Sequence, residues 1–185
     1  HHESQPHNLG GVARLKTLLD ARRARIGAQP SLFLDAGDWS EGNIFYTVDS
    51  GASALRILDL LGVSATVIGN HDFIGGPDTL LQTLRAVPER PPVLAANLNY
   101  NGYSRTAELQ AQVPPYQIFR FGSLAVGVIG VPTFALTYAS YMEPVKIVDP
   151  VPAVSYLTQT MRQQGVQAIV LVSHNSFEYN KTLAQ

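Results

Sequence analysis

Apolar residues recur along the chain at two spacings that alternate. From Gly10 to Ile26 they recur at helical spacing among arginines, which predicts an amphipathic helix; they are Val12, Leu15, Leu18, Leu19 and Ile26. Residues 31–36 instead form a short apolar run between Pro30 and Gly37, which is typical of a buried parallel strand. A helix followed by a strand is therefore the unit from which we expect the fold to be built.

The same alternation continues towards the end of the chain. In order, the sequence predicts a helix over 50–61, a strand over 64–68, a helix over 77–87, a strand over 93–96, two strands over 118–121 and 124–131 joined by a tight turn, a helix over 152–164 and a strand over 168–172. Residues 98–117 are polar and interrupted by proline, so we expect a long loop there. This order of elements predicts one α/β domain with a largely parallel sheet and some antiparallel pairing in the middle.

The composition narrows the kind of partner. The chain has 13 Lys and Arg against 14 Asp and Glu, and its net charge of -1 favours neither nucleic acid nor an anionic membrane surface. We therefore expect a small-molecule partner. Cysteine is absent, which excludes a disulfide framework, a thiolate metal site and a cysteine nucleophile. No apolar run approaches the roughly 18 residues that a transmembrane helix needs, so we expect no such segment.

Polar residues follow several of the predicted strands at the point where each strand ends. Asp38 comes after the first strand, Asn70 and His71 after the second, Asn97 after the third and His174 after the last. In open α/β sheets ligands bind outside the carboxyl ends of the strands, so these side chains can converge. Carboxylate, amide oxygen and imidazole are suitable ligands for a pair of divalent metals. Taken singly, each residue also fits a simpler role, as a turn residue or a hydrogen-bonded core histidine.

Four segments carry a resemblance to a known family. They are Leu-Asp-Ala-Gly-Asp at 34–38, Gly-Asn-His-Asp-Phe at 69–73, Ala-Asn at 96–97 and Val-Ser-His at 172–174. Together they resemble the calcineurin-like metallophosphoesterases, and within these the 5'-nucleotidase group. The resemblance covers nearly the whole chain and implies a metallophosphoesterase-type α/β sandwich with mixed, largely parallel sheets.

The resemblance implies two divalent metal ions, Zn, Mn or Fe, and assigns ligands to them by position. Asp38 would bridge both metals, and Asn70 and His174 would ligate the second one. The family also carries an Asp-x-His motif ahead of the first helix. His1 or His2 would supply its histidine, and we take His1 as the candidate ligand. Both residues equally fit the remnant of an expression tag.

His71 and Asp72 form the catalytic pair that the resemblance implies. His71 would stabilise the leaving oxygen as an acid or hydrogen-bond donor, while Asp72 would support it by stabilising the turn. Many members of the group orient this histidine with an aspartate three positions later, where this chain has the apolar Ile74. Either another group orients His71, or the rate of the reaction is lower.

The implied activity is that of a dimetal phosphomonoester hydrolase, 5'-nucleotidase-like in the full-length protein. Residues 1–185 would be an incomplete N-terminal metallophosphoesterase domain, without the Gly-His-x-His motif and the C-terminal nucleotide-binding domain of the group, and inactive or poorly active alone. A nucleotide substrate and a periplasmic or extracellular location follow from the same resemblance, while the oligomeric state stays open. Two alternatives remain: another metal-dependent ester hydrolase, of the cyclic-nucleotide phosphodiesterase or thiosulfohydrolase type, or a non-catalytic binding or scaffold protein with an incomplete metal site.

Overall fold

The computed structural model describes residues 10–42, 44–134 and 140–185. The chain divides into two compact units, His1–Ser31 and Leu32–Gln185. The first unit contains α1 (Val12–Ile26), the helix that the apolar spacing predicted. No helix in the described ranges is long and apolar enough to cross a bilayer.

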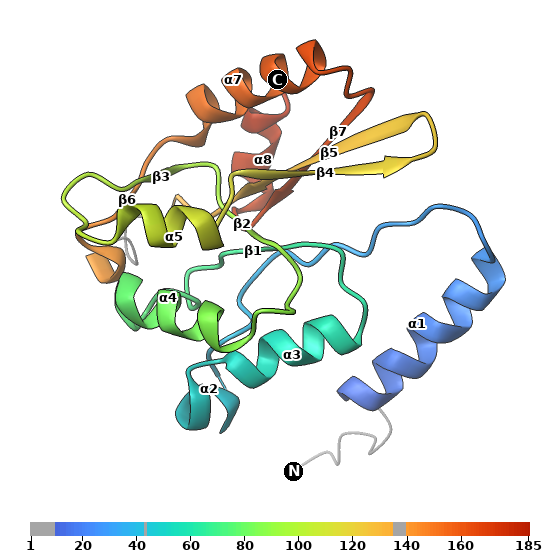
Figure 1. Cartoon of the computed structure of the whole chain (residues 1–185), viewed down its shortest axis with the longest axis horizontal. Coiled ribbons are helices and arrows are strands. Elements are labelled where there is room, and N and C mark those ends of the chain that lie inside the picture. Colours follow the sequence, from blue (N-terminus) through green and yellow to red (C-terminus); the bar gives the residue numbers. More distant parts are fainter. Residues whose placement is uncertain (1–9, 43, 135–139) are drawn as a thin grey trace. The chain divides into compact units, whose positions relative to one another are not determined.

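The second unit contains the strands and the remaining helices (Figure 1). Its described helices are α2 (Ile44–Asp49), α3 (Ala52–Leu60), α4 (Gly76–Ala86), α5 (Thr106–Gln112), the 3-10 turn η1 (Ser140–Met142), α7 (Pro150–Gln163) and α8 (Phe177–Leu183). Its described strands are β1 (Thr66–Val67), β2 (Val93–Leu94), β3 (Leu98–Asn99), β4 (Tyr116–Phe121), β5 (Leu124–Val131), β6 (Lys146–Ile147) and β7 (Ala168–Ser173). The pairs β1-β2 and β5-β7 are parallel, whereas β3-β6 and β4-β5 are antiparallel, so the sheets are mixed.

Alternate residues of β5 face two different cores. Ala125, Ile129 and Val131 pack with α7, whereas Val128 packs with β1, β2 and β7. A third core joins α3 and α4 to Val93 of β2 and to Ile68, which follows β1. Figure 1 shows α3 and α4 on one side of these strands and α7 on the other. Because β5 is covered on both faces, it is apolar almost throughout, and the predicted α/β sandwich is confirmed.

Several local predictions need correction. Residues 31–36 pair through a single parallel bridge, Leu34 to Ala65, rather than forming a regular strand. The predicted loop over 98–117 contains β3, α5 and the first residues of β4. The helices α2 and α8 were also not predicted. Both α5 and α8 are seven residues long, and they bury one residue and none respectively, so neither leaves a helical apolar pattern in the sequence.

The approach of β2 to β5 depends on Gly130. A Cβ at this position would lie 2.4 Å from Leu94 Cβ and 2.6 Å from the Leu94 carbonyl oxygen, so the backbone would have to move. We predict that Gly130→Ala lowers the free energy of unfolding by about 1 to 3 kcal/mol in urea denaturation. Gly127→Ala on the same strand is the matched control, because its Cβ would meet the flexible side chain of Met161. Equal losses in the two variants would contradict this account.

Candidate metal centre at the ends of the strands

Two glycines let the loops after the first two predicted strands touch. Gly37 has φ 96°, and a Cβ there would lie 2.6 Å from the amide nitrogen of Gly69. A Cβ on Gly69 would lie 2.2 Å from Asp38 Oδ1. Asp38 itself has φ 62°, a left-handed conformation that costs a non-glycine residue free energy. The carboxylate of Asp38 is thus held against the backbone of the second loop.

The buried carboxylate of Asp72 ties the two loops together. Its Oδ1 accepts the N–H of Ser40 at 2.9 Å, and its Oδ2 accepts those of Asp38 at 2.9 Å and Gly69 at 2.7 Å. Burial raises the pKa of Asp72 to about 6. The three N–H donors stabilise the ionised form and so lower the pKa, but burial has the larger effect. The carboxylate therefore stays largely ionised at neutral pH, the state in which both of its oxygens can accept.

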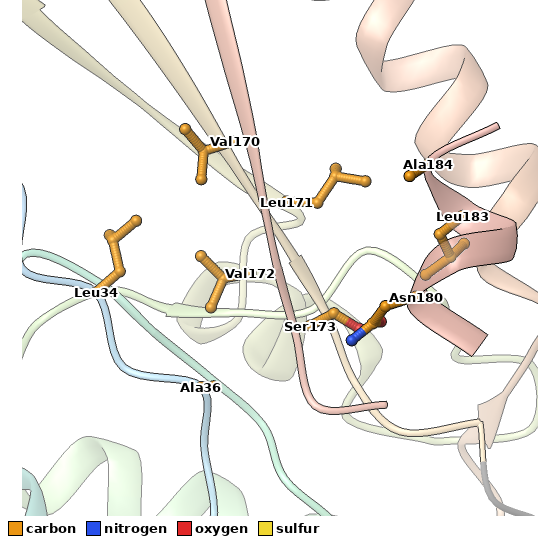
Figure 2. A pocket seen from close by; sticks show the side chains of 9 residues that line it. All are labelled: Leu34, Ala36, Val170, Leu171, Val172, Ser173, Asn180, Leu183 and Ala184. Carbon is orange, nitrogen blue, oxygen red and sulfur yellow. The ribbon is translucent and has the colours of Figure 1, made fainter. Parts of the chain in front are cut away.

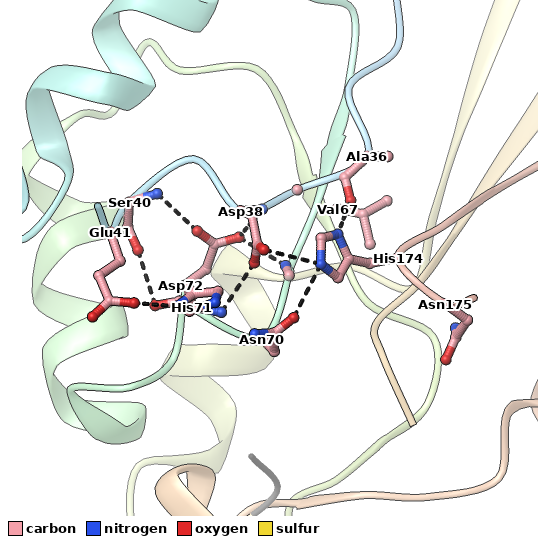
Figure 3. Close-up of polar contacts among 12 residues, drawn as sticks. Ala36, Asp38, Ser40, Glu41, Val67, Asn70, His71, Asp72, His174 and Asn175 are labelled. Atoms are coloured by element: carbon pink, nitrogen blue, oxygen red, sulfur yellow. Dashed lines mark hydrogen bonds and ion pairs between the residues drawn. The ribbon is translucent and has the colours of Figure 1, made fainter. Parts of the chain in front are cut away.

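Three side chains bring their polar atoms together, as the sequence predicted from the strand ends (Figure 3). His174 Nε2 lies 3.2 Å from Asp38 Oδ2 and 3.2 Å from Asn70 Oδ1. On the other side of the ring, Nδ1 lies 2.6 Å from the carbonyl oxygen of Ala36. Because a carbonyl only accepts, Nδ1 carries a proton, and in the neutral ring Nε2 presents its lone pair to the two oxygens.

This donor set fits a divalent metal. Ligands bound at about 2.1 Å stand roughly 3.0 to 3.4 Å apart in octahedral or tetrahedral geometry, a range that includes both distances at His174 Nε2. The hydrogen bond from Nδ1 to a backbone carbonyl is also the usual way in which a metal-binding histidine is oriented. Within the described ranges no three His, Asp, Glu or Cys side chains cluster as a metal site, and the third donor here is an amide. His1, the remaining predicted ligand, lies outside the described residues.

His71 lies beside these donors and is held by the loop that follows Asp38. Its backbone N–H donates to Asp38 Oδ1 at 3.0 Å, and its carbonyl accepts from Ser40 Oγ at 3.0 Å. Its ring Nδ1 contacts the carboxylate of Glu41. Glu41 had not been singled out from the sequence, because nothing in its spacing signals this contact. Asn97, the other strand-end residue, donates to the carbonyl of Val148.

A separate hollow of about 510 Å³ lies beside β7 and α8 (Figure 2). It is lined mainly by apolar side chains, among them Leu34, Val170 and Leu183. None of the converging donors Asp38, Asn70 and His174 lines it. The three converging donors therefore lie outside this hollow, at the loops of Figure 3.

Curated relatives identify what this chain resembles. No family model matches it. It is 30% identical to human 5'-nucleotidase and 32% identical to a probable 5'-nucleotidase of Treponema pallidum, each over 96% of the chain. The chain spans only about 30% of the length of these relatives.

Solved structures give the same result for the fold. A 5'-nucleotidase precursor from Thermus thermophilus superposes over 95% of this chain and 34% of its own, with a TM-score of 0.83 and 32% identity. The NAD nucleotidase of Haemophilus influenzae covers 96% of this chain and 30% of its own, with a TM-score of 0.81 and 27% identity. A sulfate thiohydrolase from Thermus thermophilus, at 23% identity, shares the fold.

The architecture is that of a metallophosphoesterase domain. Over nearly its whole length the chain resembles 5'-nucleotidases, which confirms the resemblance read from its motifs.

The two-loop junction can be tested through Asp72. Asp72→Asn replaces one accepting oxygen by an NH2 group that faces a backbone N–H, and we expect a loss of about 2 kcal/mol in the free energy of unfolding. Asp35→Asn is the matched control, because Asp35 accepts from Gly37 and Thr66 through Oδ1 alone, which the amide retains. Chemical denaturation of both variants would measure the difference. If Asp35→Asn lost as much stability as Asp72→Asn, the loss in Asp72→Asn could not be assigned to its second accepting oxygen.

Proposed function

We propose that this chain carries part of the dimetal centre of a 5'-nucleotidase-like phosphomonoester hydrolase. The observation that carries the proposal is the convergence of Asp38, Asn70 and His174 on one point, at spacings that suit a shared metal. With a neutral His174 ring, all three atoms offer lone pairs and repel one another unless a cation lies among them. The 30% identity to human 5'-nucleotidase, over 96% of this chain, supports the same conclusion.

Two divalent metals, Zn, Mn or Fe, fit the proposed chemistry. Asp38 would bridge them, and Asn70 and His174 would hold the second metal, with His1 a candidate ligand of the first. When bound, the metals would neutralise phosphate charge and lower the pKa of a coordinated water. Asn70 contributes a neutral oxygen, so it completes a coordination shell without adding negative charge near an anionic substrate.

The neighbouring residues divide the remaining work. His71 would donate a proton or a hydrogen bond to the leaving oxygen. Its backbone N–H donates to Asp38, so the carboxylate that would hold metal also fixes the backbone of His71. Asp72 would act by holding both loops rather than by touching substrate, because its oxygens are occupied by backbone N–H groups.

The proposed substrate is a nucleoside 5'-monophosphate, the class for which the relatives are named. We propose that residues 1–185 form the N-terminal metallophosphoesterase domain of a longer protein and that a C-terminal domain recognises the nucleoside. The chain spans about 30% of the relatives' length, in keeping with this division. A periplasmic or extracellular location is part of the same proposal.

Asp38→Ala tests the metal centre. The protein should be expressed with the gene sequence that flanks these residues, and its bound metal and its hydrolysis of AMP with Mn²⁺ should be measured. We expect Asp38→Ala to lose the bound metal and to lower AMP hydrolysis at least about 100-fold, because the bridging carboxylate is removed. Asp59→Ala is the matched control, since that exposed aspartate on α3 should change neither quantity.

Two results would count against the proposal. Metal content and activity that survive Asp38→Ala would remove Asp38 from the centre. An unaltered protein that binds no metal and hydrolyses no phosphate ester would favour the scaffold alternative. A panel that includes cyclic nucleotides and sulfur esters would separate the hydrolase alternatives from each other.

A further inference from the structure

We infer that Glu41 is the residue that orients the His71 ring for catalysis, a positioning role that rests on the proposed function. The carboxylate of Glu41 contacts Nδ1 of His71. Figure 3 shows the two side chains directed toward each other from the loop that follows Asp38 and the loop that follows β1. A carboxylate at Nδ1 determines which ring nitrogen carries the proton and fixes the plane of the ring.

The carboxylate nearest in sequence is not available for this task. Asp72 adjoins His71, but both of its oxygens accept backbone N–H groups from other residues. Three positions after His71 the chain has Ile74, which has no polar side-chain atom. Glu41 thus supplies from another loop a carboxylate that the loop of His71 does not offer.

The same short segment holds His71 at its backbone and at its ring. Asp38 accepts its N–H, Ser40 donates to its carbonyl and Glu41 contacts its Nδ1. These three residues lie within four consecutive positions, 38–41. The proposed metal ligand and the proposed acid are therefore oriented by one piece of chain, so that their mutual geometry is set locally.

The contact is unsuited to a purely structural role. The side chains of His71 and Glu41 are 36% and 34% exposed, and ion pairs at this exposure contribute little to folding. Asp72, by contrast, is buried and accepts three N–H groups. Removal of the Glu41 carboxylate should therefore leave the fold intact while it removes the contact at Nδ1 of His71.

The first measurement requires no activity. In ¹⁵N-detected ring spectra of the metal-free protein, at a pH where the ring is neutral, we expect His71 to carry its proton on Nδ1. Glu41→Gln keeps an oxygen that can accept this proton and should keep the tautomer, whereas Glu41→Ala should shift it towards Nε2. A wild-type ring protonated on Nε2, or a tautomer unchanged in Glu41→Ala, would overturn the inference.

The second measurement compares two leaving groups. An acid matters most for a poor leaving group, so Glu41→Ala should lower kcat for AMP about 10- to 100-fold but kcat for p-nitrophenyl phosphate less than about threefold, with KM for both within about twofold. Glu41→Gln should recover most of the loss. Glu178→Ala, which removes an exposed ion pair with Lys181 on α8, is the matched control and should match the wild type.

The two measurements distinguish this inference from the proposed function. A wild-type protein that hydrolyses neither ester refutes the proposed function, and the tautomer then decides whether Glu41 orients the ring. If the wild type is active, equal losses of kcat for both esters in Glu41→Ala, or no loss for either, would overturn the positioning role.

Discussion

The contact between two loops at Gly37 and Gly69 is the constraint on which the candidate centre depends. Neither position has room for a Cβ, because each would meet the other loop at less than 3 Å. Three backbone N–H groups on the two loops then converge on the carboxylate of Asp72, which is buried and compensated by them. A carboxylate in such a position cannot be replaced by an apolar side chain without leaving those donors unsatisfied. The junction is therefore a polar core of the site, distinct from the apolar cores of the fold.

This junction also explains how Asp38 is held in an unfavourable conformation. A left-handed φ at a non-glycine residue costs about 1 to 3 kcal/mol, and it persists only where neighbouring contacts fix it. Asp38 is fixed at its N–H by Asp72 and at its side chain by the N–H of His71, and its other carboxylate oxygen faces His174. The strained residue thus contacts both of the other segments of the centre, the loop of His71 and the end of β7. Backbone strain at such a position is typical of a functional site.

The sequence predicted the parts of this molecule that depend on chain order and missed those that depend on the path of a loop. Asp38, Asn70 and His174 were predicted to converge because each follows a strand, and the ends of parallel strands lie at one edge. Glu41 was missed because its contact with His71 requires the turn at Asp38, which no spacing rule describes. The helices α5 and α8 were missed for a different reason: with at most one buried residue each, they have no apolar stripe to detect. Residues 31–36 were predicted as a strand from an apolar run, yet they pair with only one neighbour, at Leu34.

The protonation of His174 links the fold to the chemistry of the centre. The carbonyl of Ala36 lies on the segment that leads into Gly37 and Asp38, so the proton on Nδ1 joins the end of β7 to the first loop. If the ring is neutral, the same proton leaves Nε2 as an acceptor facing the carboxylate of Asp38 and the amide oxygen of Asn70. Three acceptors at this spacing repel one another, whereas a cation among them would attract all three and outweigh that repulsion. Metal binding should therefore contribute to the order of these loops as well as to reactivity, because the groups that would hold the metal also hold the loops in place.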